Sequence, residues 1–281
     1  MDKKKKKLSP LARFRGFIQA GATLLTNLHL PNFAKGALYQ GGGKYVCVPG
    51  LNCYSCPAAA GACPIGSFQA VVGSSKFSFS YYITGFLILF GVLLGRFICG
   101  FLCPFGLIQE LLHKIPTPKL KKSRYTAALS KMKYIILAVF VIILPLTFKY
   151  PGFCKFICPA GTFEAGIPMY FANEQIAAMV GALFSWKVGL MAAILIGVVF
   201  VYRGFCRFIC PLGAIYSFFN KVSIIGVCVD EHKCTECGRC VRECKMDIKK
   251  VGDMECISCG ECMKVCKEDA ICWKHKKERR K

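Results

Sequence analysis

"GRFICGFLCPFGLI" occupies residues 95–108, and near-copies follow as "GFCKFICPAGTF" at 152–163 and "GFCRFICPLGAI" at 204–215. Each copy places two cysteines four residues apart, which puts both on one face of a helix, one turn from each other. The proline after the second cysteine cannot continue that helix but suits the first turn of a new one. Each copy therefore predicts a helix end that carries two thiolates and then a fresh helix start, which is half of a four-thiolate metal site.

The composition narrows the classes of protein to consider. The chain has 281 residues, 20 cysteines, 54% hydrophobic residues and a formal net charge of +23. So many cysteines indicate disulfides or metal ligands, and a secreted disulfide domain would be smaller and would lack long apolar runs. The basic surplus lies beside apolar runs, so we interpret it as a membrane topology signal and expect no nucleic-acid partner.

Four apolar stretches are predicted to cross a membrane, at about 14–34, 81–98, 134–148 and 188–202. The last three are slightly short of the ~20 residues a crossing needs, unless each helix runs on into its cysteine motif. The first is interrupted by Asn27 and His29, and its alternative is an interfacial amphipathic helix. Basic residues gather before the first span and between the second and third, so both termini are expected to face the cytoplasm. We therefore expect a multi-pass protein of the cell (inner) membrane, with lipid around four helices and no cleavable signal peptide.

The motifs also predict an internal two-fold repeat. Placing Cys103 on Cys210 aligns "RFICGFLCPFGLI" with "RGFCRFICPLGAI", and placing Cys63 on Cys158 aligns "CPIGSFQA" with "CPAGTFEA". Each half then consists of an outer Cys-Pro-x-Gly segment, a span and an inner motif, and such repeats surround shared sites in other membrane proteins.

Four thiols fall at the predicted cytoplasmic ends of the spans, and we expect them to hold one iron–sulfur cluster. They are Cys99, Cys103, Cys206 and Cys210. Arg96 and Arg203 would either balance the negative charge of that cluster or extend to the lipid headgroups. The alternative for these thiols is that cysteine is simply a small packing residue.

Five further cysteines fall on the predicted outer face, and they suggest a second metal site with one spare cysteine. They are Cys53, Cys56, Cys63, Cys154 and Cys158. A disulfide among them is the alternative, because an oxidising exterior would permit it. The small residues of "AAAGACPIGSFQAVVG" suit a half-helix that re-enters the membrane where protein covers it.

The spacing C-x2-C-x2-C-x3-C occurs twice after residue 228, as in bacterial ferredoxins with two [4Fe-4S] clusters. In that arrangement the fourth cysteine of each run crosses to the other cluster. The first cluster would use Cys234, Cys237, Cys240 and Cys266, and the second Cys256, Cys259, Cys262 and Cys244. Zinc is the competing metal, but zinc sites rarely need two interlocked sets of four. Cys47, Cys228 and Cys272 have no evident partner, so we expect them to be packing residues.

The expected fold is therefore mainly α: a multi-pass helical membrane domain with an internal repeat, plus a small α+β two-cluster ferredoxin domain. The expected divisions are a basic N-terminus with the first span (1–35), an outer loop (36–80), the motif-bearing helices (81–222), the ferredoxin-like domain (223–272) and a basic tail (273–281).

With these motifs, the chain resembles the NapH/NosR-type membrane polyferredoxins, and it is similar to the CcoG-type assembly proteins. The resemblance implies electron transfer between the membrane quinol pool and a reductase partner. The motifs at 99–104 and 206–211 and the eight ferredoxin cysteines carry it, whereas the motif at 154–159 goes beyond it.

Three functions follow as hypotheses. The first is electron transfer between the ferredoxin domain, an intramembrane cluster and the quinone pool, with His113 (beside Gln109 and Glu110) as a candidate proton-handling residue.

The second is a relay through the outer cysteines to an exported flavin, haem or thiol partner. A span of about 15 residues is about 23 Å long, so this relay needs re-entrant outer segments to shorten the path. The third is a metal-handling or assembly protein. Since no G-x-G-x-x-G follows a strand, we expect an electron-transfer subunit with redox partner proteins rather than an enzyme with its own hydride chemistry.

Overall fold

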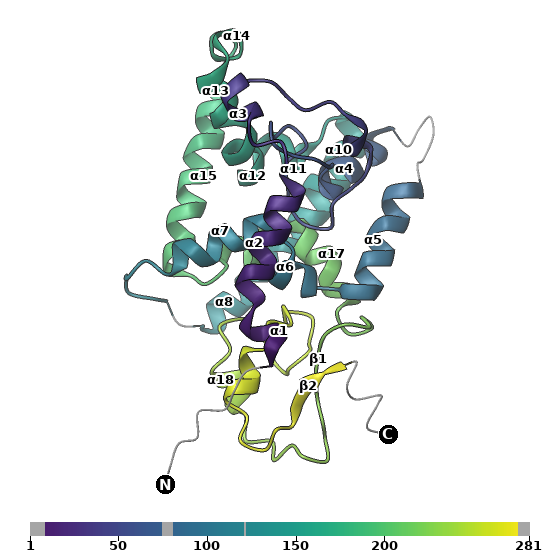
Figure 1. Cartoon of the computed structure of the whole chain (residues 1–281), viewed down its shortest axis with the longest axis vertical. Helices are drawn as coiled ribbons and strands as arrows, with labels where there is room; N and C mark the ends of the chain where they lie inside the picture. Colours follow the sequence, from purple (N-terminus) through teal and green to yellow (C-terminus); the bar gives the residue numbers. More distant parts are fainter. Residues whose placement is uncertain (1–8, 75–80, 121, 275–281) are drawn as a thin grey trace.

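The computed structural model describes residues 9–74, 81–120 and 122–274, which form a mainly helical molecule (Figure 1). The basic run Lys3–Lys7 and most of the basic tail expected at 273–281 lie outside the described residues. A small domain containing β1 and β2 lies at one end, opposite the end that carries α13 and α14 (Figure 1).

The chain begins with α1 (Pro10–Arg13), α2 (Arg15–Thr26), α3 (Asn32–Lys35), the 3-10 turn η1 (Gly42–Tyr45) and α4 (Pro64–Ser74). It continues with α5 (Tyr81–Leu94), α6 (Phe97–Phe101), α7 (Pro104–His113), α8 (Arg124–Leu129), α9 (Met132–Ile136), the π-helical segment η2 (Leu137–Ile143) and α10 (Leu144–Phe148). The next segments are α11 (Gly152–Phe156), α12 (Pro159–Gly161), the π-helical η3 (Thr162–Gly166), α13 (Ile167–Ala172), α14 (Glu174–Ala178), α15 (Ala182–Phe200), α16 (Gly204–Phe208) and α17 (Pro211–Phe219). The tail contains β1 (Val227–Val229), α18 (Arg239–Arg242), the 3-10 turn η4 (Glu261–Lys264) and β2 (Ile271–Trp273).

Two helices of the described chain are long and apolar enough to cross a membrane. One runs through α8, α9, η2 and α10 over Arg124–Phe148, with 25 residues, and the other is α15, with 19 residues. The apolar helix α5 has 14 residues and α2 has 12, so each is shorter than a full crossing. Two of the four predicted spans thus have the length for a crossing, and the other two stay predictions.

The expected continuation of the spans into the cysteine motifs is wrong. Helix α5 ends at Leu94 and α15 ends at Phe200, before either motif. Gly95 (φ 52°) and Arg203 (φ 50°) then take the left-handed conformation, which interrupts a right-handed helix. The long helices gain their length at their other ends, from Arg124 and Ala182.

The tail repeats one backbone conformation in its two cysteine runs. Glu236 and Ser258, each just before the second cysteine of its run, both have φ 51°. Gly238 and Gly260, each just after that cysteine, have φ 67° and 76°. Strands β1 and β2 pair antiparallel and close this small domain.

Candidate iron–sulfur sites

The three Cys-x-x-x-Cys-Pro segments share one backbone conformation. In each, a five-residue helix (α6, α11 or α16) ends just before the second cysteine, and a new helical segment begins at the proline. The second cysteine's N–H donates to the carbonyl five residues earlier in each copy: Cys103 to Ile98 at 3.0 Å, Cys158 to Phe153 at 2.9 Å, and Cys210 to Phe205 at 2.9 Å. The predicted helix end and fresh helix start are confirmed.

The inner thiols come together from α6, α16 and the cysteines that begin α7 and α17. Cys99, Cys103, Cys206 and Cys210 are each at most 6% exposed. Burial, with the negative charges of Cys206 and Cys99, raises the pKa of Cys103 to about 12. The pKa of Cys210 is raised well above its ordinary value by burial and by the charges of these same three neighbours. The four thiols therefore lie within electrostatic range of one another.

The outer thiols form a second group around Cys158. Burial raises the pKa of Cys158 well above its ordinary value, and the thiolates of Cys154, Cys53 and Cys63 raise it further. A Cβ added at Gly161 would lie 3.6 Å from Cys53 Sγ and 4.0 Å from Cys158 Sγ. The backbone thus leaves open space among these sulfurs.

The sixth residue after the cysteine of each Cys-Pro-x-Gly segment (at 63, 103, 158 and 210) is polar and reaches across to another segment. Gln109 Nε2 donates to Cys206 Sγ at 2.9 Å, and Gln69 Nε2 donates to Cys154 Sγ at 3.2 Å. At the equivalent position of the third motif, Glu164 accepts from the N–H of Cys53 at 2.7 Å. In the fourth motif Tyr216 donates to the Pro49 carbonyl at 3.0 Å. We call these four contacts braces. They were not predicted from the sequence, although the alignment of "CPIGSFQA" with "CPAGTFEA" already placed Gln69 on Glu164.

The braces distinguish the spare outer cysteine. Gln69 contacts Cys154 and Glu164 contacts Cys53, so Cys53 takes the place that the first cysteine of a motif has elsewhere. Cys56 lies instead beside Asn27, with 3.8 Å between Sγ and Oδ1, and the ammonium of Lys44 is 3.4 Å from its carbonyl. The thiols within electrostatic range of Cys158 thus favour Cys53 over Cys56 as the fourth outer thiol.

A single peptide unit connects the inner and outer groups. The backbone N–H of Leu51 lowers the pKa of Cys103, and that of Asn52 lowers the pKa of Cys63, in each case against the larger effect of burial. A Cβ added at Gly50 would lie 3.0 Å from Cys103 Cα, so this outer loop packs directly onto the inner motif. Tyr216, fully buried, lies within electrostatic range of Cys99 and Cys63.

The tail brings together the cysteines expected for its second cluster. Burial raises the pKa of Cys262 above its ordinary value, and thiolates of both runs raise it further: Cys256, Cys259 and Cys244. Those expected for the first cluster line one cavity of about 970 Å³: Cys234, Cys237, Cys240 and Cys266. The crossing of the fourth cysteine between the two runs is thus compatible with the geometry of the tail.

Comparison with known proteins agrees with this chemistry. Residues 78–123, 133–167 and 182–227 match a family described as a 4Fe-4S binding domain. Regulatory protein NosR of Pseudomonas aeruginosa is 27% identical over 155 residues, which cover 53% of this chain and 20% of NosR. The chain is similar to NosR-type 4Fe-4S proteins.

Other relatives come from other organisms. Methylamine utilization ferredoxin-type protein MauN of Methylorubrum extorquens is 24% identical over 66% of this chain and 55% of MauN. Protein MJ0749 of Methanocaldococcus jannaschii is 31% identical over 172 residues, 57% of each chain. The chain therefore spans between a fifth and about two thirds of the length of these curated relatives. No solved structure matches it.

Buried arginine N–H groups fit an anionic group at the inner site. Arg96 and Arg203 are both 0% exposed, so the alternative that they extend to lipid headgroups is wrong. Within the described residues, Arg96 Nε and Nη2 and Arg203 Nη2 have no hydrogen-bond acceptor, although the thiolates of Cys99 and Cys206 lie within electrostatic range of both arginines. Buried donors are normally satisfied, and an iron–sulfur cluster with four thiolates is anionic, so these residues suit one.

The described residues contain no ready-made site for a single metal ion. Across residues 9–74, 81–120 and 122–274, no three His, Cys, Asp or Glu side chains are close enough to hold one metal ion. Thiolates that share one zinc each lie about 2.3 Å from it. The thiolates of a cluster lie farther apart because iron and sulfide fill the volume between them.

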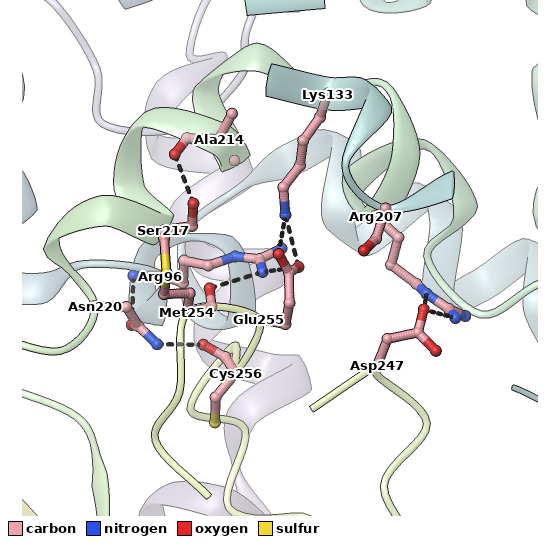
Figure 2. A network of polar contacts seen from close by, with 12 residues as sticks. Arg96, Lys133, Arg207, Ala214, Ser217, Asn220, Asp247, Met254, Glu255 and Cys256 are labelled. Atoms are coloured by element: carbon pink, nitrogen blue, oxygen red, sulfur yellow. Dashed lines mark hydrogen bonds and ion pairs between the residues drawn. The ribbon is translucent and has the colours of Figure 1, made fainter. Parts of the chain in front are cut away.

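Ion pairs hold the ferredoxin-like tail against the inner site (Figure 2). Glu255 accepts from Lys133 Nζ at 2.6 Å and from Arg96 Nη1 at 2.7 Å, and Arg207 pairs with Asp247. Asn220 Nδ2 donates to the carbonyl of Cys256 at 2.9 Å. The expected second-cluster site of the tail is therefore held next to the inner thiols, because Glu255 and Cys256 are adjacent in the chain.

The residues considered for quinone proton chemistry have other contacts. Glu110 pairs with Arg15 at 2.7 Å and with Arg203 at 2.9 Å, and Gln109 bonds Cys206. His113 Nδ1 lies 3.2 Å from the Val198 carbonyl, and its ring packs against Tyr202. The structure places His113 outside the groups of thiols, and its role stays a prediction.

Proposed function

We propose that this chain is a membrane-bound iron–sulfur protein that passes electrons between its ferredoxin-like tail and the outer group of thiols, by way of the inner group. A [4Fe-4S] cluster, when bound, supplies one-electron chemistry at a potential set by its surroundings. The expected holders are the two tail sets, the inner set (Cys99, Cys103, Cys206 and Cys210) and the outer set (Cys53, Cys63, Cys154 and Cys158). MauN, a relative described as a ferredoxin-type protein, supports this class of function.

The continuity of the sites carries the proposal. Gln109, Arg96 and Arg203 surround the inner thiols, and Glu255 holds the tail against them. On the other side, the Leu51–Asn52 peptide lies between Cys103 and Cys63. The obstacle of a hop of about 23 Å does not apply to such a path, since the outer loop packs against the inner motif.

The membrane placement belongs to the same proposal. Arg124–Phe148 and α15 would cross the bilayer, α5 and α2 would complete four spans with the help of packed neighbours, and α4 would be re-entrant. Both termini would face the cytoplasm, with one redox partner on each side. Exchange with a quinone near His113 and metal handling stay predictions of the sequence, because no contact of the described residues favours them.

A vesicle experiment tests the relay. Full-length protein is reconstituted anaerobically with the tail outward around enclosed ferricyanide, and dithionite is added outside. We expect ferricyanide reduction by wild type and by Cys56→Ser, and a loss of at least tenfold in Cys63→Ala and in Cys158→Ala, with the electron paramagnetic resonance (EPR) signals of the tail intact. Equal rates in all four proteins would overturn the proposal.

A further inference from the structure

Cys228 and Cys272 lie directly opposite each other in the tail sheet. They are the central residues of β1 and β2, and their sulfur atoms are 3.3 Å apart. The ladder hydrogen bonds lie two residues to either side: Asp230 N–H to Ala270 at 2.7 Å, and Lys274 N–H to Gly226 at 2.8 Å. Because this ladder alternates with a period of two, Cys228 and Cys272 form a hydrogen-bonded pair, in which Cα atoms are about 5.5 Å apart.

These two thiols belong to none of the expected cluster sets. The sequence predicted packing residues with no evident partner, whereas the structure places each beside the other. Both are half-buried, so small reagents can reach them. Cys228 also lines the cavity of about 970 Å³ that contains Cys234 and Cys266.

We propose that Cys228 and Cys272 are a reversible dithiol–disulfide pair, a redox modification site beside the first-cluster cavity of the tail. A disulfide needs sulfurs about 2.05 Å apart and Cα atoms about 4.4–6.8 Å apart, and the pair meets the second condition already. Forming the bond shortens the distance between the two sulfurs from 3.3 Å to about 2.05 Å.

The oxidant is a low-molecular-weight disulfide. The thiolate of one cysteine attacks it, forms a mixed disulfide and releases one thiol. The second cysteine attacks the mixed disulfide, forms the Cys228–Cys272 bond and releases the second thiol, so one disulfide is reduced as the other forms. In a reducing compartment the two cysteines remain thiols. Oxidation links β1 covalently to β2 at the wall of the cavity.

Mass spectrometry of the full-length protein tests this site. Protein purified anaerobically is treated with oxidised glutathione, alkylated in denaturant with a chelator, and digested without reductant. We expect the peptides of Cys228 and Cys272 to be linked, at least tenfold above the untreated sample, and to separate again with dithiothreitol. Cys47→Ser should retain the link, whereas Cys228→Ser and Cys272→Ser should each carry one glutathione on the remaining thiol.

Two results would overturn the proposal. One is wild-type protein that forms no link between these peptides at any glutathione ratio, while exposed thiols of the same sample react. The other is a Cys228→Ser/Cys272→Ser protein that lacks about four irons per chain, because that loss would make the pair ligands.

Discussion

Leu51 and Asn52 are consecutive residues whose backbone N–H groups face thiols of different sites, Cys103 of the inner group and Cys63 of the outer group. Because these two N–H groups belong to neighbouring residues, the same short stretch of the outer loop lies beside Cys103 and beside Cys63. The proposed relay depends on this loop, because it lies between the two groups of thiols.

Space among the outer sulfurs predicts the effect of Gly161→Ala. The added Cβ makes only ordinary contacts with Cys53 and Cys158, so the protein should fold, but the methyl group occupies volume that a cluster needs. We expect a loss of about four irons per chain. Gly189→Ala is the matched control, since its Cβ meets nothing within 4 Å. Full iron content in Gly161→Ala would contradict this use of the space.

The Gln109 brace predicts a change of reduction potential. Its N–H donates to Cys206 Sγ, and such donors favour the more negative, reduced state of a cluster. A hydrogen bond worth about 1 kcal/mol corresponds to about 40 mV for one electron, so Gln109→Ala should lower the inner potential by about that amount. EPR redox titration measures it, with exposed Gln175→Ala as the control. An unchanged inner signal would show that the brace does not tune the site.

Docking of the tail depends on Glu255. In Glu255→Gln, the buried Lys133 and Arg96 lose their carboxylate, and breaking a buried pair in this way costs about 3–5 kcal/mol. The tail should become sensitive to limited proteolysis, and the inner EPR signal should broaden. Glu261→Gln is the matched control, because the Glu261–Lys264 pair is about half exposed and contributes about 0–1 kcal/mol. Equal proteolysis of the two variants would argue against the clamp.

Glu164 predicts a pH dependence of stability. Burial raises the pKa of Glu164 from 4.5 to about 7, although the Cys53 N–H opposes this rise. Because the folded-state pKa lies above the unfolded one, the associated stability is complete below about 4.5 and is lost as the pH rises through about 7. The loss is about 3 kcal/mol. Urea unfolding between about pH 5 and pH 8 should show this slope in wild type and in Glu174→Gln but not in Glu164→Gln; a slope that persists in Glu164→Gln would assign it to other groups.

The local features were predictable from the sequence because they depend on local chemistry. The spacing of Cys103 and Pro104 sets a helix end and a helix start, and this appears unchanged in the structure. The resemblance to NosR-type proteins was likewise recognised from the spacing of the cysteines, and the comparisons agree.

Long-range pairings were not predictable from one sequence. Nothing near Glu255 in the chain marks Arg96 and Lys133 as its partners, which are over a hundred residues away. The choice of Cys53 over Cys56 depends on Glu164, again from a distant segment. The helix ends were misjudged because Arg203, a non-glycine residue, takes a left-handed conformation that composition does not indicate.

Iron and sulfide analysis of anaerobically purified full-length protein, combined with EPR, tests the central claim of four connected sites most directly. The account predicts about 16 irons and as many sulfides per chain, with a loss of about four in Cys103→Ser and of another four when Cys158→Ser is added. About eight irons, unchanged by either substitution, would mean that clusters bind only in the tail and would contradict the relay.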